Sequence, residues 1–164
     1  MDTQIRYRDA ERQDVGLLLQ FIRELAAYEK LAHTVEAEEG DIATNLFGDR
    51  PTAHAMIAEW EGEPAGFALW YTNFSTFVGR PGLYVEDLFV RPRFRSRGIG
   101  KGFFACLADL SMQRGYGRME WAVLDWNAPS IGFYESLGAV ALSDWTGYRL
   151  DRGRIAALVR HRPD

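Results

Sequence analysis

The sequence predicts an α/β (α+β) fold in which helices cover the faces of a mixed sheet. Three observations lead to this prediction. The chain has 164 residues, which fits a single domain spanning 1–164. Hydrophobic residues make up 47% of the chain, which is enough to build a core. Strand-like runs and segments of helical periodicity follow one another in the order βααβββαβαββ.

The first six predicted elements lie in the N-terminal half. Apolar residues that recur every three or four positions predict a helix over about 11–30. Turn residues at 61–64 separate two strand-like runs, so we expect a hairpin there. The other elements of this half are a strand at Ile5 and Tyr7, a helix at 36–47 that ends at Gly48, the hairpin strands at 53–60 and 65–73, and a strand at 83–90.

The second half begins with a glycine-spaced loop and a predicted helix over about 98–114. Ile99, Phe103 and Leu107 fall on one face of this helix, which we expect to be buried. The remaining predicted elements are a strand at 119–124, a helix at 129–137 stopped by Gly138, closing strands at 140–142 and 148–150, and a short helix at 153–161.

Charge and composition narrow the classes of partner. The net charge is −4 and the isoelectric point is about 5.4, which argues against nucleic acid as the main partner. No segment approaches the ~20 apolar residues that span a bilayer, and the N-terminus lacks a signal-peptide pattern. We therefore expect a cytoplasmic protein with no membrane partner. Cys106 is the single cysteine, so neither an internal disulfide nor a metal site is expected.

A basic cluster surrounds the glycine-spaced loop that joins a strand to a helix. Gly98 and Gly100 lack a Cβ, so an anion can approach the amides of the first helical turn. The stretch has neither a P-loop ending nor a full G-x-G-x-x-G fingerprint, so neither ATP nor NAD is favoured. We predict a pyrophosphate site here; a helix start with a solvated basic rim is the alternative. The basic residues are Arg91, Arg93, Arg95, Arg97 and Lys101.

Two adjacent acids, Glu86 and Asp87, interrupt the apolar strand at 83–90. Burying a carboxylate is costly unless it is paired or hydrogen-bonded. Neighbouring strand residues point to opposite faces unless a bulge intervenes, so at least one acid is expected to face a cleft. The alternative is that one acid pairs with a core arginine while the other lies at an edge.

A second polar pair lies at the helix predicted over 129–137. Asn127 can cap this helix, and Pro129 suits its first turn because no N–H is needed there. Tyr134 follows Asn127 by nearly two helical turns, so both side chains project to the same side. A capping asparagine and a core tyrosine is the alternative interpretation.

These motifs resemble the GNAT superfamily of N-acetyltransferases, whose fold is a mostly antiparallel central sheet flanked by helices. Arg95-x-x-Gly98-x-Gly100 resembles the acetyl-CoA loop of that family. Four segments resemble the branch of diamine, polyamine (spermidine/spermine) and thialysine acetyltransferases. These segments are ELAAYE at 24–29, LYVEDLFV at 83–90, AVLDWN at 122–127 and FYESLGA at 133–139.

The resemblance implies acetyl-CoA as co-substrate and no metal. The backbone of Leu88, Phe89 and Val90 would pair with the pantetheine arm. The diphosphate would lie on the loop formed by Arg95, Ser96, Arg97, Gly98, Ile99, Gly100 and Lys101. Further contacts to the cofactor would come from Asn127, Ala128, Pro129 and Ser130.

For the amine, the resemblance implies contacts to Tyr28, Glu29, Glu86 and Asp87, with Tyr134 as general acid. Direct attack needs a neutral amine, and neutralising a lysine-like amine at pH 7 costs ~4.6 kcal/mol. A carboxylate such as Glu86 can accept that proton, directly or through a water. No covalent enzyme intermediate is required, and we interpret Cys106 as a packing residue.

One position departs from the family pattern, because Ser96 stands where the family usually has glycine. Serine fits there without strain only if its φ is negative. The leading prediction is an enzyme that acetylates a small cationic amine, and the resemblance also implies a homodimer. Two alternatives remain: an acetyltransferase acting on protein or peptide amines, and a non-catalytic acyl-CoA-binding domain.

Overall fold

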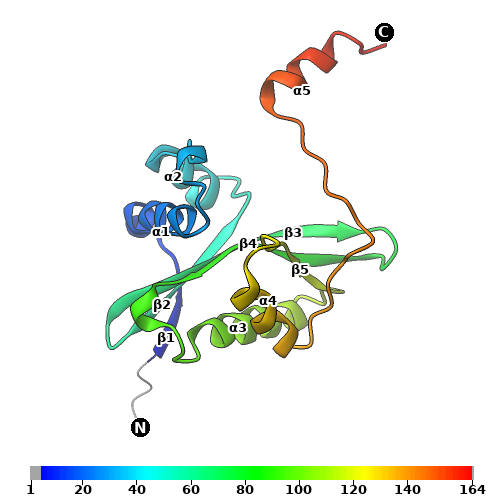
Figure 1. The fold of residues 1–164 in the computed structure, drawn as a ribbon. Helices are drawn as coiled ribbons and strands as arrows, with labels where there is room; N and C mark the ends of the chain where they lie inside the picture. The colour runs from blue at the N-terminus through cyan, green and yellow to red at the C-terminus, as the bar shows by residue number, and fades with distance from the viewer. Residues whose placement is uncertain (1–4, 164) are drawn as a thin grey trace. The chain divides into compact units, whose positions relative to one another are not determined.

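The structure is a computed structural model that describes residues 5–163 (Figure 1). Its residues form two compact units, Met1–Leu124 and Asp125–Asp164. The first contains five strands: β1 (Ile5–Asp9), β2 (His54–Trp60), β3 (Glu63–Ser75), β4 (Arg80–Val90) and β5 (Met119–Trp121). Its helices are α1 (Val15–Tyr28), α2 (Glu39–Phe47) and α3 (Ile99–Gln113), with 3₁₀ turns at Arg12–Asp14, Ala32–Thr34 and Pro92–Phe94. The second contains α4 (Ala128–Ser136) and α5 (Arg152–Val159).

The strands of the first unit form one sheet in sequence order, β1-β2-β3-β4-β5. Neighbouring strands are antiparallel except β4 and β5, which run parallel and are connected through α3. This confirms the predicted α/β fold with a mostly antiparallel mixed sheet. The predicted hairpin is also present, as β2 and β3 are joined by a tight turn at Glu61 and Gly62.

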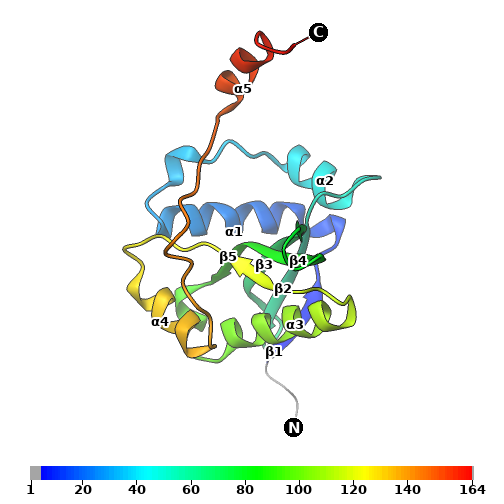
Figure 2. The same cartoon turned by 90° about the vertical axis from the view of Figure 1, so that its right-hand side faces the viewer.

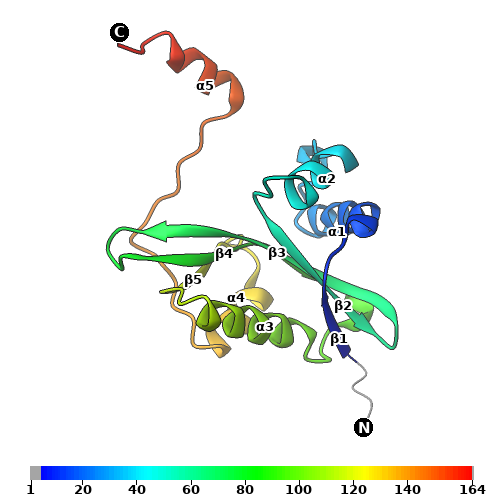
Figure 3. The same cartoon turned by 180° about the vertical axis from the view of Figure 1, so that it is seen from behind.

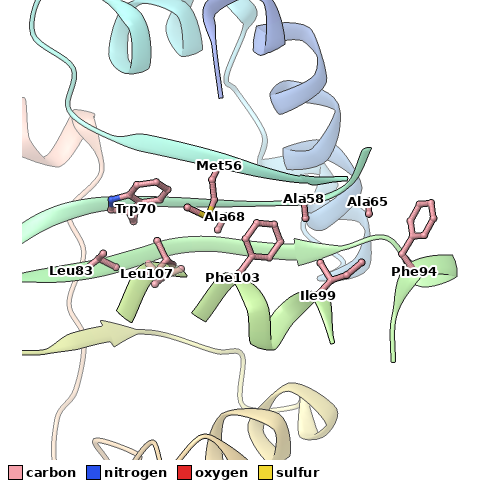
Figure 4. Packing of buried hydrophobic residues seen from close by; sticks show 11 residues of the cluster. Met56, Ala58, Ala65, Ala68, Trp70, Leu83, Phe94, Ile99, Phe103 and Leu107 are labelled. Atoms are coloured by element: carbon pink, nitrogen blue, oxygen red, sulfur yellow. The ribbon is translucent and has the colours of Figure 1, made fainter. Parts of the chain in front are cut away.

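The helices of this unit cover both faces of the sheet, with α1 and α2 on one side and α3 on the other (Figures 2 and 3). Strand alternation accounts for the two cores. On β2, Ala55 and Ile57 belong to the core against α1 and α2, whereas Met56 and Ala58 belong to the core against α3. Figure 4 shows the α3 side, where the predicted helix face of Ile99, Phe103 and Leu107 packs on the sheet.

A β-bulge at Glu86 interrupts the pairing of β3 with β4. Val85 pairs with Trp70 and Asp87 pairs with Leu69, so Glu86 is an extra residue on β4. Such an insertion disturbs the alternation of side chains and bends the strand.

The change of alternation is visible in the two cores. Leu83 and Val85 pack in the core on the α3 side of the sheet. Strict alternation would place Phe89 on that same face, but Phe89 packs in the core against α1. Asp87 lies two residues before Phe89 and therefore shares the α1 face. The bulge thus directs a carboxylate to the side of the sheet where α1 ends.

Two sequence predictions need correction. The strands expected at 140–142 and 148–150 are absent, since residues 139–150 carry no strand in the described chain. Runs of only three residues do not form strands without a strand edge to pair with. The strand expected at 119–124 ends at Trp121 because β5 pairs with β4 only over Leu83–Val85, just before the bulge.

The C-terminal helix predicted at 153–161 is confirmed as α5, which begins after the Asp151 cap. Among residues 5–163, no helix combines the length and the apolar character needed to cross a lipid bilayer.

Candidate functional site

The second half of β4 presents an open edge. Since β5 pairs only with Leu83–Val85, no strand of the described chain continues the sheet beside residues 86–90. The Arg91 N–H donates to the Ala65 carbonyl on β3, and successive residues of an antiparallel strand direct their backbone groups to opposite sides. The backbone groups of Leu88 and Val90 therefore point away from β3, toward the open edge. These are two of the three residues predicted to pair with an extended ligand, and Phe89 lies between them.

Three of the predicted amine-contacting acids lie close together in the structure. Asp87 is electrostatically coupled to both Glu86 and Glu29. Glu29 caps the C-terminus of α1 directly after Tyr28, and Glu86 and Asp87 come from the bulge of β4. We call Glu29, Glu86 and Asp87 the acid cluster. The sequence separates Glu29 from the other two, and the packing of α1 on the sheet brings them together.

The acid cluster contains one strongly perturbed carboxyl. Burial, reinforced by the negative charges of Glu86 and Glu29, raises the pKa of Asp87 from 3.8 to about 7. Burial also raises the pKa of Glu29. Glu86 itself is exposed at the bulge. A carboxyl that titrates near neutral pH can either accept or release a proton there, which is the property required of an acid–base group.

The loop before α3 adopts the conformation expected of an anion site. Gly98 caps α3 with φ +82°, and a Cβ built there would meet no atom within 4 Å, so the space beside it is open. No side chain caps this helix end and no acid lies in its first turn. The first-turn amides are therefore available to an anion, which the helix dipole also favours.

Ser96 has a positive φ of +59°, so the condition for an unstrained serine at this position is not met. This is the left-handed region, which costs a non-glycine residue roughly 1–2 kcal/mol. The structure therefore places strain at the position where the family usually has glycine. The strain lies on the loop, two residues before the Gly98 cap.

The loop arginines contact other protein groups in this structure. Arg91 donates two bonds of 2.9 Å to Glu24 on α1, which lowers the pKa of Glu24. Arg93 pairs with Glu63, and Arg97 lies over the Trp60 ring at 4.4 Å. These three arginines contact other parts of the protein, and their contacts with an anion stay a prediction.

Arg95 contacts the open edge itself. Its Nε donates to the Val90 carbonyl at 2.9 Å, and its Cζ lies 4.7 Å from the centre of the Tyr28 ring. The same guanidinium lies 5.8 Å from the Phe89 ring. Arg95 therefore joins the loop, the edge of β4 and the end of α1.

The second unit carries the other predicted residues. Asn127 caps α4, with its side chain accepting a bond from the Ser130 N–H, and Pro129 lies in the first turn as predicted. Tyr134 lies within α4, nearly two turns after Asn127. The capping prediction is confirmed. The contacts of Asn127, Ala128, Pro129, Ser130 and Tyr134 with a ligand stay predictions.

Two supporting residues were missed by the sequence analysis. The Tyr7 hydroxyl donates to the Ile99 carbonyl at 3.0 Å, which anchors the first turn of α3. A Cβ on Gly102 would lie 1.8 Å from that hydroxyl oxygen, so glycine is required for this approach. The second missed residue is Glu24, which bonds to Arg91. In the sequence, only its position in the ELAAYE segment pointed to a role. Among residues 5–163, no group of three or more His, Cys, Asp or Glu side chains could hold a metal ion.

Asp87→Asn is expected to change how stability depends on pH. Between pH about 4 and 7 the folded protein holds a proton on Asp87 that the unfolded chain has released, so the free energy of unfolding falls as pH rises. Asparagine does not ionise, so the variant does not lose stability as the pH rises. It should be more stable than wild type by about 2–4 kcal/mol at pH 8, with little difference at pH 4. Urea unfolding at both pH values measures it. Asp49→Asn, which removes an exposed acid, is the control; parallel curves for wild type and Asp87→Asn would contradict the prediction.

Ser96→Gly is expected to stabilise the protein. Glycine removes the left-handed penalty of roughly 1–2 kcal/mol but adds about 0.4–1 kcal/mol of unfolded-state entropy, so the net gain is about 0.5–1 kcal/mol. Chemical denaturation measures it, with Ser96→Ala as the matched control because alanine keeps the Cβ and the strain. An equal gain from both substitutions would show that the backbone conformation is not the cause.

Comparisons with known proteins identify the family of the chain. Residues 19–139 match the Acetyltransferase (GNAT) family. Thialysine N-epsilon-acetyltransferase from Bos taurus is 36% identical over 90% of this chain and 91% of its own length. L-ornithine N5-acetyltransferase from Arabidopsis thaliana is 28% identical over 93% of this chain and 87% of its own.

A solved structure shows the same fold. An integron cassette protein from the mobile metagenome of V. cholerae superposes with a TM-score of 0.79 at 24% identity, covering 96% of this chain and 99% of the other. The family match spans most of the chain, and the relative from Bos taurus extends over nearly all of it. On this family match and these relatives, the chain belongs to the GNAT family and is an N-acetyltransferase.

Proposed function

We propose that this acetyltransferase transfers the acetyl group of acetyl-CoA to a primary amine of a small cationic substrate, such as a lysine-like amino acid, a diamine or a polyamine. The acid cluster carries the proposal. Glu29, Glu86 and Asp87 place up to three negative charges beside the open edge of β4, in a chain whose loop arginines are already engaged. Such a cluster attracts a cation and repels an anion.

The chain's residues fit acetyl-CoA. The backbone groups of Leu88 and Val90 point to an unpaired edge, where an amide-containing arm can add like a strand. The amides after Gly98 and the open space beside it suit a diphosphate. Acetyl-CoA, when bound, supplies the thioester that the amine attacks. We propose that the loop from Arg95 to Lys101 orients it.

The acid cluster would also manage the proton of the amine. An ammonium with a pKa of ~10.4 must lose a proton before it attacks, at a cost of ~4.6 kcal/mol at pH 7. A carboxylate that contacts the ammonium can accept this proton directly or through a water. Glu86 is our proposed acceptor, and Asp87, with its pKa of about 7, is the group in the cluster that can hold the proton next. Tyr28 and Glu29 complete the contacts to the substrate.

Tyr134 would assist the leaving thiolate. A tyrosine hydroxyl with a pKa of ~10 is a weaker acid than a thiol at ~8.5, so complete transfer is uphill by ~2 kcal/mol. A hydrogen bond from the hydroxyl to the developing thiolate supplies stabilisation without complete transfer. Asn127, Ala128, Pro129 and Ser130, at the start of α4, would contact the cofactor in the same region. A homodimer and a cytoplasmic location belong to this proposal by resemblance.

The relatives point to the same substrate class. The two relatives described above are named for thialysine and L-ornithine, which are both amino acids with a side-chain amine. A turnover screen with acetyl-CoA, following release of free thiol, tests the proposal across lysine, thialysine, ornithine, putrescine, spermidine and N-terminal peptides. We expect turnover with at least one of the free cationic amines. Turnover of peptides alone, or binding of coenzyme A without turnover, would contradict it and favour the other candidate functions.

Tyr134→Phe is expected to lower kcat by about 100-fold, because a positioned proton donor contributes roughly 10²–10⁴ in rate. The KM for acetyl-CoA should change by less than about threefold, because the hydroxyl acts on the transition state. Steady-state kinetics with the best amine from the screen measures both constants. Tyr148→Phe, which removes the same atom from an exposed tyrosine, is the control. A kcat for Tyr134→Phe close to that of the control would exclude Tyr134 as the donor.

A further inference from the structure

We propose that Arg95 is a positioning residue that occupies the open edge of β4 until the pantetheine arm displaces it, and so links the acyl-donor site to the amine site. The proposal rests on the proposed function, because it requires the arm to pair with β4. It assigns Arg95 a contact with the strand edge as well as the predicted contact with the diphosphate.

The first observation is the bond to Val90. The Arg95 Nε donates to the Val90 carbonyl at 2.9 Å. This carbonyl belongs to the residue whose backbone groups point away from β3. A strand-like ligand that adds to this edge directs its own N–H at the same carbonyl. Arg95 therefore already bonds to the carbonyl that an added strand would use, and we propose that the ligand takes over this bond.

The second observation is the contact with α1. The Arg95 guanidinium lies 4.7 Å from the centre of the Tyr28 ring, in the range of a cation–π contact. Tyr28 is the last residue of α1, and the next residue, Glu29, belongs to the acid cluster. When the guanidinium leaves the edge of β4, this contact changes as well. Occupation of the strand edge and the surroundings of the amine site are thereby coupled.

The third observation is that the neighbouring arginines have other partners. Arg91 is held by Glu24, Arg93 pairs with Glu63, and Arg97 lies over Trp60. Arg95 is also adjacent to Ser96, whose left-handed φ lies at the start of the anion loop. A displaced Arg95 side chain can turn toward the diphosphate, where a guanidinium forms charge-assisted bonds. The cost of losing the Val90 bond is then offset for acetyl-CoA but not for a donor that lacks the diphosphate.

Arg95→Lys tests this prediction with two acyl donors. Lysine keeps the positive charge but lacks the planar guanidinium that bonds the carbonyl and stacks on Tyr28. We expect kcat/KM for acetyl-pantetheine to rise about fivefold while kcat/KM for acetyl-CoA stays level or falls. The ratio of the two constants should therefore rise at least fivefold. Arg50→Lys is the control, because it makes the same change at an exposed arginine outside the loop and should leave the ratio within about twofold of wild type. Equal changes for both donors would overturn the proposal.

A binding measurement separates this proposal from the proposed function. The Nε–H signal of Arg95 in ¹⁵N-labelled protein, assigned by its loss in Arg95→Lys, reports the bond to Val90 directly. Saturating coenzyme A should shift this signal and speed its exchange with water, whereas adenosine 3′,5′-bisphosphate, which lacks the pantetheine arm, should leave it unchanged.

The outcomes are distinct. An unmoved signal in the presence of bound coenzyme A overturns the Arg95 proposal and leaves the proposed function intact. A signal that moves equally with the bisphosphate overturns it too, because Arg95 then responds to phosphate charge alone. Absence of any coenzyme A binding overturns both proposals.

Discussion

The bulge at Glu86 is the constraint on which the rest of the site depends. One extra residue in β4 changes which face each later side chain occupies, so Asp87 and Phe89 turn toward α1. β5 ends its pairing at Val85, just before the bulge, which leaves the edge beside residues 86–90 open. A single backbone irregularity therefore accompanies both a partly buried acid and an unpaired strand edge. In the proposed reaction, the strand edge would hold the thioester and the acid would lie beside the amine.

The electrostatics of the site are divided between two elements. The acid cluster lies where α1 ends beside β4. Burial raises the pKa of Asp87, so a fraction of this carboxyl stays protonated near neutral pH. In the predicted anion loop the backbone amides are the main candidate donors, because Arg91 and Arg93 pair with Glu24 and Glu63 and Arg97 lies over the Trp60 ring. Fixed amides bind an anion without requiring flexible side chains to become ordered. The arginines, in turn, hold that loop against the sheet and α1.

Two neighbouring residues connect the strand edge with the start of α3. Arg95 bonds to Val90 and lies over Tyr28, and Ser96 holds a conformation that favours glycine. Both residues lie between the strand edge and the helix start. Strain and internal hydrogen bonds at such positions are typical of functional sites, where the surrounding structure maintains them. The loop is thus placed to respond to binding at either end.

The sequence by itself determined the family, the order of most elements and the chemical character of each motif, because these follow from local periodicity, turn residues and residue type. The helix start after the glycine-spaced loop, the hairpin at 61–64 and the Asn127 cap are local features, and each was predicted correctly. Only the tertiary structure decided the bulge at Glu86, the meeting of Glu29 with Asp87, and the bond of Arg95 to Val90. The closing strands were wrongly predicted for the same reason: a strand depends on a partner edge that lies elsewhere in the chain. Pairing register, burial and charge interactions involve residues that are far apart in sequence, so no local sequence pattern predicts them.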